Sequence, residues 1–204
     1  MKKSLIAAAL ASALCLVNES KADSREGWSP LGLGLCAPVQ FPGRTSDVYG
    51  LRLGGLYGHH VNVYGLDASL CGIQEDFAGV QAAGVSWSHG TTVGLQVALV
   101  SVDTFFQGVQ VSALNWDSAE AAGVQLAAVN ANQSSFEGLA AGGLNASLRF
   151  AGCQLGVINT ADDMDGVQIG VFNAAQRLWG VQIGLLNLVC ESKLPIMVVA
   201  NACF

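Results

Sequence analysis

An eight-residue phrase that recurs along the chain constrains the fold more than any other feature of the sequence. GVQIGVFN at 166–173 is followed by six residues and then by GVQIGLLN at 180–187. The glycine that opens the phrase recurs every 14 or 15 residues without a gap. A regular period of this kind is typical of repeat architectures, in which each unit stacks on the one before it. The glycines that define the ten units are Gly50, Gly65, Gly79, Gly94, Gly108, Gly123, Gly138, Gly152, Gly166 and Gly180.

Positions within a unit are numbered from this glycine, which is position 0. Positions −2, +1, +3 and +6 are mostly apolar, and position +2 is Gln in most units. Position +4 is always Gly, Ala or Ser. Position +7 is Asn in the last six units, at Asn115, Asn130, Asn145, Asn159, Asn173 and Asn187.

This pattern predicts strands rather than helices. The chain contains 25 glycines, and a glycine inside a helix destabilises it by roughly 0.5–1 kcal/mol relative to Ala. Positions +1 and +3 alternate with +2 and are rich in Val, Ile and Leu, as in a strand. The sequence therefore predicts an all-β fold, a parallel β-solenoid. This flattened β-roll or β-helix would have about ten coils of 14–15 residues and a cap at each end.

The period also predicts where the side chains of each coil lie. A coil of this length has a perimeter of roughly 46–50 Å, which fits two sheet faces about 10 Å apart and two corners. We expect positions −2, +1, +3 and +6 to fill the interior, and the small residue at +4 to keep the thin core from overfilling. Glycine at position 0 is expected at a corner. Asparagine at +7 is expected to form a ladder of amides along the stack.

An antiparallel outer-membrane β-barrel with one strand per unit is the alternative fold. Alternating apolar residues at 196–202 before the terminal Phe204 resemble the last strand of such a barrel. Barrel strands need about 9–11 residues of alternation. Here the alternation lasts about five residues before the apolar position +6 breaks it, so the sequence favours the solenoid.

The first residues are typical of a secretory signal. Lys2 and Lys3 precede an apolar stretch at 5–17 and a small-residue cleavage site at 20–22. Residues 1–22 are therefore predicted to be a signal peptide. The chain is expected to be exported to the cell surface, the outer membrane or the periplasm.

The repeat array is expected to lie between two caps. Residues 23–47 are predicted to form the N-terminal cap, 48–187 the ten-unit array and 188–204 a C-terminal cap strand. All four prolines lie outside 43–194. Because proline cannot donate to a strand ladder, its absence there agrees with continuous pairing.

The charge of the chain argues against nucleic acid as a partner. Without residues 1–22 there are six basic and 14 acidic residues left of the nine and 15 in the whole chain, a net charge of −8. A negative protein is repelled by phosphate backbones and by anionic membrane surfaces. The partner is therefore expected to be a surface protein or a polysaccharide, with self-association as a further option. A membrane is expected only for the barrel alternative.

The cysteines show no metal-binding spacing. Cys71 at position +6 and Cys153 at +1 are expected to be small core residues. Export would permit disulfides, and Cys190 with Cys203 is the candidate pair, as a clip on the C-terminal end.

No catalytic, cofactor-binding or metal-binding site is expected. His59 and His60 are adjacent and are expected on an exposed connector, and His89 is alone; no further metal ligands have a recognisable spacing. The acidic run at 162–165 lacks the spacing of a calcium loop, so a solvated corner is favoured.

An enzyme that uses connector carboxylates is a further reading of the sequence. Asp103, Asp117 and Glu120 are the carboxylates that such an enzyme would pair across neighbouring coils. We expect that they do not share a column, which argues against this reading. No GxSxG, HExxH or GxxxxGK[ST] motif occurs.

The phrase G-[LV]-Q-[ILV]-G-[LV]-[ILVF]-N, clearest at 152–159, 166–173 and 180–187, resembles the bacterial surface repeat-containing proteins. Residues 48–51 and 63–67 look like the openings of the array in that family. The resemblance covers roughly residues 28–204. It implies export and a cell-envelope location, and it supplies no catalytic or binding residues. The sequence thus predicts a structural or interaction role without catalysis, with a membrane pore as the alternative.

Overall fold

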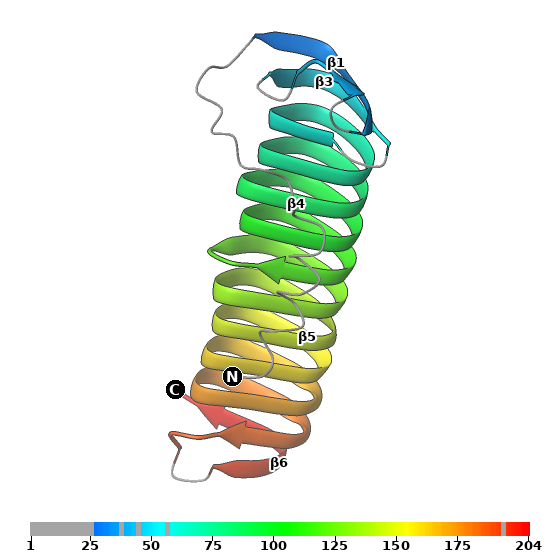
Figure 1. Ribbon diagram of the computed structural model, residues 1–204. Coiled ribbons are helices and arrows are strands. Elements are labelled where there is room, and N and C mark those ends of the chain that lie inside the picture. The colour runs from blue at the N-terminus through cyan, green and yellow to red at the C-terminus, as the bar shows by residue number, and fades with distance from the viewer. Residues whose placement is uncertain (1–26, 37–38, 44–45, 56–57, 193–194) are drawn as a thin grey trace, which may run out of the picture.

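The structure, a computed structural model, describes residues 27–36, 39–43, 46–55, 58–192 and 195–204. The predicted signal peptide lies outside the described residues. The described chain forms a rod of stacked coils (Figure 1). Its strands are β1 (Trp28–Cys36), β2 (Val39–Phe41), β3 (Asp47–Gly54), β4 (Gly58–Asp117), β5 (Ala121–Val189) and β6 (Ile196–Cys203).

Neighbouring coils of the array run parallel. β1 pairs with β3, β3 with β4 and β4 with β5, all in the parallel direction. Equivalent positions of successive units face each other, so that Gly50 lies opposite Gly65 and Gly108 opposite Gly123. The prediction of a parallel β-solenoid is therefore confirmed, and the antiparallel alternative is wrong.

The array contains fewer strands than one strand per unit would give. β4 and β5 are each continuous over many residues, and each winds through several coils. The chain therefore stays extended and paired around the corners instead of breaking at each one. All six strands belong to one sheet, in the order β2-β1-β3-β4-β5-β6.

Glycine at position 0 is required by its backbone conformation and by a close approach between coils. The φ angle of these glycines ranges from 125° at Gly123 to 146° at Gly79, which residues with a side chain rarely adopt. A Cβ atom on Gly123 would lie 2.0 Å from the carbonyl oxygen of Gly108 in the preceding coil. The same approach recurs from Gly65 to Gly180, so these glycines form one continuous column.

Both ends of the sheet are antiparallel. β2 pairs with β1, and β6 pairs with the end of β5, where Gly180 lies opposite Cys203. Within β6, Val199 has a φ of 75°, close to a shift of register between Gly184 and Asn187. An open sheet edge is a template for further pairing. The reversed direction and the irregularity of β6 therefore favour termination of the stack.

The interior of the coils differs from the predicted one. Position +6 is half-buried in most units, and positions +1 and +3 point outward, so the prediction that +1 and +3 fill the interior is wrong. Position −2 faces inward, as predicted, and Phe136 and Phe150 stack there with ring centroids 5.1 Å apart. The buried residues at −2 are Val48, Val63, Phe77, Thr92, Phe106, Ala121, Phe136, Phe150, Met164 and Leu178.

Strand alternation explains this difference. Side chains two residues apart share a face of a strand, and those three residues apart do not. Because position −2 is inside, positions +2 and +4 are inside as well, and +1, +3 and +5 are outside. Gln81, Gln96 and Gln110 at +2 are consequently 0% exposed. Burial of both −2 and +1 would require side chains three residues apart to share a face, which regular strand alternation does not give.

Candidate functional site

The buried glutamines at +2 bond to one another along the rod axis. Nε2 of Gln96 donates to Oε1 of Gln81 at 3.0 Å, and Nε2 of Gln110 donates to Oε1 of Gln96 at 2.8 Å. The amides of Gln96 and Gln110 are thus donors to one coil and acceptors from the next, which satisfies their buried polar atoms. Beyond Ala140, which takes the +2 position of one unit, the same bonds link Gln154, Gln168 and Gln182.

The asparagines at +7 form a second row of this kind. From Asn115 to Asn187, each Nδ2 donates to Oδ1 of the asparagine in the next coil at 2.8–2.9 Å. Nδ2 of Asn159 also donates to the carbonyl oxygen of Ile169 at 3.0 Å. A Cβ atom on Gly170, at position +4, would lie 2.6 Å from that Nδ2 atom. The small residue at +4 therefore leaves the space that the asparagine row needs.

An ion pair takes the place of two glutamines in the first two units. Arg52 and Asp67 stand at +2 and are both buried. Nε of Arg52 donates to Oδ1 of Asp67 at 2.7 Å, and its Nη2 donates to Oε1 of Gln74 at 2.7 Å. Nε2 of Gln81 donates to Oδ2 of Asp67 at 2.7 Å. A buried charge needs a partner, and here the paired charges also join the glutamine row.

Asp103 and Asp117 are buried carboxyl groups in neighbouring coils. Both stand at position +9 of their units, so the expectation that they do not share a column is wrong. Oδ1 of Asp103 accepts a hydrogen bond from Oγ1 of Thr92 at 2.8 Å, and its Oδ2 accepts one from Nε2 of Gln110 at 2.8 Å. The side-chain amide of Gln125 donates to Oδ2 of Asp117. Sequence reasoning missed this pair because the two positions were not compared by their distance from the repeat glycine.

Burial changes the acidity of both groups. It raises the pKa of Asp103 to about 7, although the hydrogen bonds to that carboxyl lower it. Burial also raises the pKa of Asp117 to about 8, and the nearby charge of Asp103 adds to this rise. Among the described residues, Oδ1 of Asp117 has no hydrogen-bond partner, and neither has Oδ1 of Asn132 at the same position of the next coil. A proton on Asp117 supplies a donor that its carboxylate form lacks.

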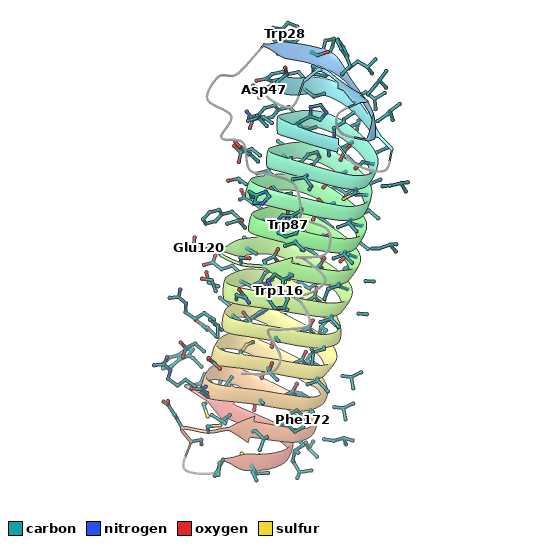
Figure 2. All side chains as sticks on the ribbon, in the orientation of Figure 1. Trp28, Asp47, Trp87, Trp116, Glu120 and Phe172 are labelled. Carbon is teal, nitrogen blue, oxygen red and sulfur yellow. The ribbon has the colours of Figure 1, made fainter. Side chains whose placement is uncertain are left out.

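The outside of the rod carries a broad apolar surface. Positions +1, +3 and +5 of every unit point outward, and no residue there has a charge, a hydroxyl or an amide. We call this surface the apolar outer face. Leu99 and Leu185 on it are 67% and 69% exposed. In Figure 2, the side chains that project on the right of the rod are carbon, whereas oxygen and nitrogen atoms project on the left, where Glu120 is labelled.

The apolar outer face continues over both ends of the array. β1 extends it with Leu31 and Leu33, which lie opposite Leu51 and Leu53 of β3. At the other end, β6 adds Ala200 and Ala202, which lie opposite residues 183 and 181 of β5. These added residues are also exposed. The surface therefore runs the whole length of the described stack.

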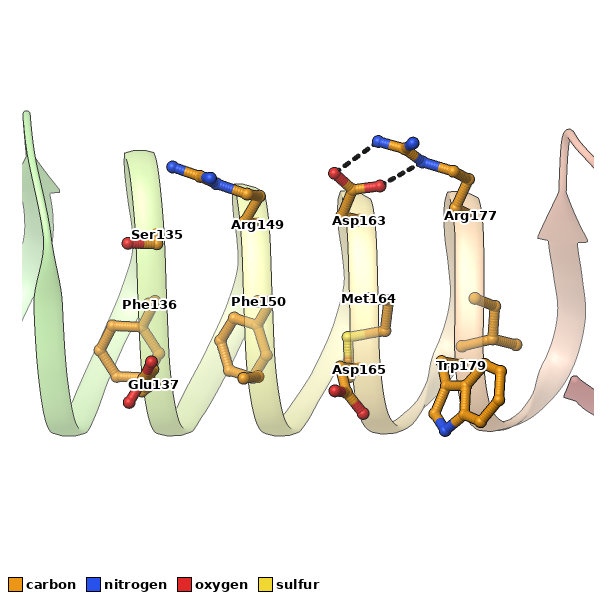
Figure 3. Close-up of a pocket in the computed structure, with 12 residues that line it drawn as sticks. Ser135, Phe136, Glu137, Arg149, Phe150, Asp163, Met164, Asp165, Arg177 and Trp179 are labelled. Carbon is orange, nitrogen blue, oxygen red and sulfur yellow. Dashed lines mark hydrogen bonds and ion pairs between the residues drawn. The ribbon is translucent and has the colours of Figure 1, made fainter. Parts of the chain in front are cut away.

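The charged side chains gather on a different side of the coil. We call positions +10 to −1 the polar edge, and a groove with a volume of about 370 Å³ crosses successive coils there. Arg149, Asp163 and Arg177 lie on one side of it, and Asp165 and Trp179 on the other (Figure 3). Nη2 of Arg177 donates to Oδ2 of Asp163 at 2.7 Å. An exposed ion pair of this kind contributes little stability. The groove is also lined by Phe136, Phe150, Met164 and Leu178, so it combines charged sides with an apolar lining.

The remaining candidate residues do not converge on one site. His60 is buried, so its prediction as an exposed connector residue is wrong. His89 is exposed and stacks on Trp87 with ring centroids 5.6 Å apart. The side chain of His59 lies outside the described part, and Glu120 is exposed. Within the described ranges, no three His, Cys, Asp or Glu side chains are placed to hold a metal ion.

The cysteines differ from their predictions. Cys190 and Cys203 are free thiols, so the candidate disulfide is wrong. Cys203 lies opposite Gly180, whereas Cys190 follows Gly180 by most of a coil and therefore lies on another side of the rod. Cys71 and Cys153 are half-exposed rather than core residues. Position +1 points outward, and position +6 is half-buried in most units.

No family model, curated protein or solved structure matches this chain. The resemblance to surface repeat-containing proteins therefore stays a prediction from the residues. In the part of the chain that the structure describes, no helix has the length and apolarity to cross a membrane.

Proposed function

We propose that this chain is an exported, non-catalytic repeat protein of the cell envelope or cell surface, and that it contacts its partner through the apolar outer face. The observation that carries the proposal is the arrangement of the side chains. Rows of amides are inside the rod, and aliphatic side chains are outside it. Large contiguous apolar patches on a protein surface mark interaction sites.

The size of this face supports an interaction role. Ten units at about 4.8 Å give a length of roughly 48 Å, and positions +1 to +5 at about 3.3 Å per residue give a width of roughly 13 Å. The flat area is therefore about 600 Å², before β1 and β6 are added. This equals or exceeds the largest patch on a typical monomer, which is about 300–600 Å².

The chemistry of the face favours a protein partner over a polysaccharide. A sugar placed against aliphatic side chains would leave its hydroxyls without hydrogen bonds, and buried polar groups without partners are unfavourable. A second apolar protein surface has no such cost. The partner class is therefore a protein.

A non-catalytic role agrees with the burial of the perturbed carboxyl groups. Perturbed pKa values often mark catalytic groups. Asp103 and Asp117 are only 1% and 0% exposed, inside a closed row of side chains, and a substrate has no access to them. Their role is in the interior hydrogen bonding. The envelope location is supported by the predicted signal peptide and by the family resemblance.

Photo-crosslinking in bacterial cells that export the chain tests this proposal. A photoreactive amino acid replaces Leu126 on the apolar outer face, and in a matched variant it replaces Gln133 on the polar edge; both positions are exposed. We expect a defined protein adduct from position 126 and none from position 133, with both variants in the envelope or the medium. Retention in the cytoplasm, or equal labelling from both positions, would contradict the proposal.

A further inference from the structure

We propose that the occupant of the apolar outer face is a second copy of this chain, packed face to face with the first. This inference rests on the proposed function, because it names the partner of the same surface. It is carried by the area of the face, by the kinds of side chain on it and by the position of the charges.

The area is sufficient for a stable pair. A specific interface buries at least about 1,000 Å² in total over both partners. Two copies of a face of roughly 600 Å² bury about 1,200 Å² by the spacings used above. β1 and β6 carry the same surface beyond the array and increase this total. The two copies therefore need no further contact to form a pair.

The side chains suit the packing of one sheet on another. The face contains only Leu, Ile, Val, Ala, Gly and Cys153, arranged in straight columns with one residue per coil. Columns of similar aliphatic side chains on flat sheets form dry, interdigitated interfaces when two sheets meet about 10 Å apart. Among the described residues, the ionised side chains outside the rod stand on the polar edge, so that pairing buries none of these charges.

The same composition is poorly suited to a lipid surface. Proteins that rest on membranes commonly place Trp and Tyr at the interface and Lys or Arg beside the apolar surface. The apolar outer face has no Trp, Tyr, Lys or Arg at positions +1, +3 and +5 of any unit. The exposed charges on the polar edge are mostly acidic, as at Glu75, Glu120, Glu137 and Asp165. A second copy is therefore favoured over a bilayer.

Two identical faces pair through a two-fold axis. Position +3 is the middle column of the face, so the +3 residues of one copy lie nearest the +3 residues of the other. Val97 and Ile169 occupy this column in distant coils and are 44% and 42% exposed. A charge placed at either position would be buried without a partner in the pair. It would remain in water in the single chain, so folding is unaffected.

Sedimentation equilibrium of the mature chain, from residue 23 onward, tests the inference. We expect the wild type to have twice the monomer mass. The double variant Val97→Lys with Ile169→Lys should raise the dissociation constant by roughly a thousandfold or more, since about 1.4 kcal/mol corresponds to tenfold. The matched control Gln107→Lys with Gln133→Lys adds the same charge on the polar edge and should remain a dimer. Circular dichroism of all three proteins verifies that the β structure is unchanged.

Three outcomes would overturn the inference. The first is a wild type that stays monomeric at all concentrations. The second is a dimer that the face variant leaves intact, because the contact would then lie elsewhere. The third is a monomer that floats with phosphatidylcholine vesicles, with or without phosphatidylserine. A crosslink from position 126 to another protein would leave the proposed function standing without the second copy. Flotation that the face variant abolishes would also contradict the protein partner of the proposed function.

Discussion

At the scale of single residues, the rod is held by interior side chains that bond to their own kind. A Gln or Asn amide is both a donor and an acceptor, and the spacing of about 4.8 Å between coils brings like amides within hydrogen-bond reach. Such a row accepts only two kinds of interruption. One is a residue that needs no partner, as at Ala140, which leaves Nε2 of Gln154 in the next coil without one. The other is an ion pair, as in Arg52 and Asp67.

The buried carboxyl groups make the stability of the rod depend on pH. Asp117 has a pKa of about 8 in the folded chain, against an ordinary value of 3.8. Between these values the native state holds a proton that the unfolded state lacks. The contribution of this group is therefore fully present below pH 3.8 and is lost as the pH rises to about 8. The loss is ~1.4 kcal/mol for each pH unit.

The variant Asp117→Asn tests this dependence. Asparagine stays neutral and keeps the shape of the protonated side chain. We expect its free energy of unfolding to exceed that of the wild type most at about pH 8 and least near pH 4. Urea titrations across this pH range measure the difference. The control Asp165→Asn changes an exposed carboxylate and should follow the wild-type profile. A constant difference between Asp117→Asn and the wild type would contradict the assignment.

At the scale of the strand, alternation decides what each coil presents. Position −2 and the amide at +2 share one side, so the aliphatic residues at +1, +3 and +5 take the other. At the C-terminal end of the rod, the last parallel coil would leave its backbone N–H and C=O groups unpaired. β6 meets those groups in the antiparallel direction, from Gly180 to Leu188 of β5.

Removal of residues 195–204 tests the role of β6 as a cap. The truncated chain exposes the backbone groups of the last coil, which are a template for pairing with other chains. We expect light scattering that grows with protein concentration and time. Removal of Phe204 alone is the control, since this residue follows β6 and is 81% exposed. A truncated chain that stays as clear as the control would show that β6 does not protect the edge.

At the scale of the whole molecule, the rod consists of nearly equivalent coils stacked on one another. In such arrays each repeat contacts only its neighbours, so stability is close to a sum over repeats and their interfaces. The register between coils depends on the unit length rather than on the total length. Whole units are therefore removable, and fractions of a unit are not.

Deletion of residues 152–165 tests this modularity. The deletion removes 14 residues, one whole unit, and joins Ala151 directly to Gly166. We expect a folded rod with the same type of circular dichroism spectrum and a melting temperature a few degrees lower. The control deletion of residues 152–158 removes half of the unit and joins Ala151 to Asn159, so that later positions no longer lie over their equivalents in the preceding coil. Equal behaviour of the two deletions would contradict this account.

The period, the parallel stacking and the need for glycine at position 0 are all predictable from the amino-acid sequence, because they follow from the spacing of residues within one coil. The sequence also predicts the asparagine row, since a repeated amide at one position has its own copy as the nearest partner. The repeated glutamine at +2, from Gln81 to Gln182, indicates a row of the same kind. This row was not among the predictions, because the neighbouring apolar positions +1 and +3 favour a core on the other side of the strand.

Which side of each strand faces inward depends on how the coils stack and is not predictable from the sequence pattern. Both sides carry regular columns, and hydrophobicity alone favours burying Leu and Val at +1 and +3 over Gln at +2. The amides gain most of their bonds from the coils above and below, as Gln110 does from Gln96, and these bonds exist only after stacking. The buried residues at −2, with Phe136 among them, set the phase of the alternation. That phase places positions +1, +3 and +5 on the outside and so creates the apolar outer face. The phase itself is established only when the coils stack on one another.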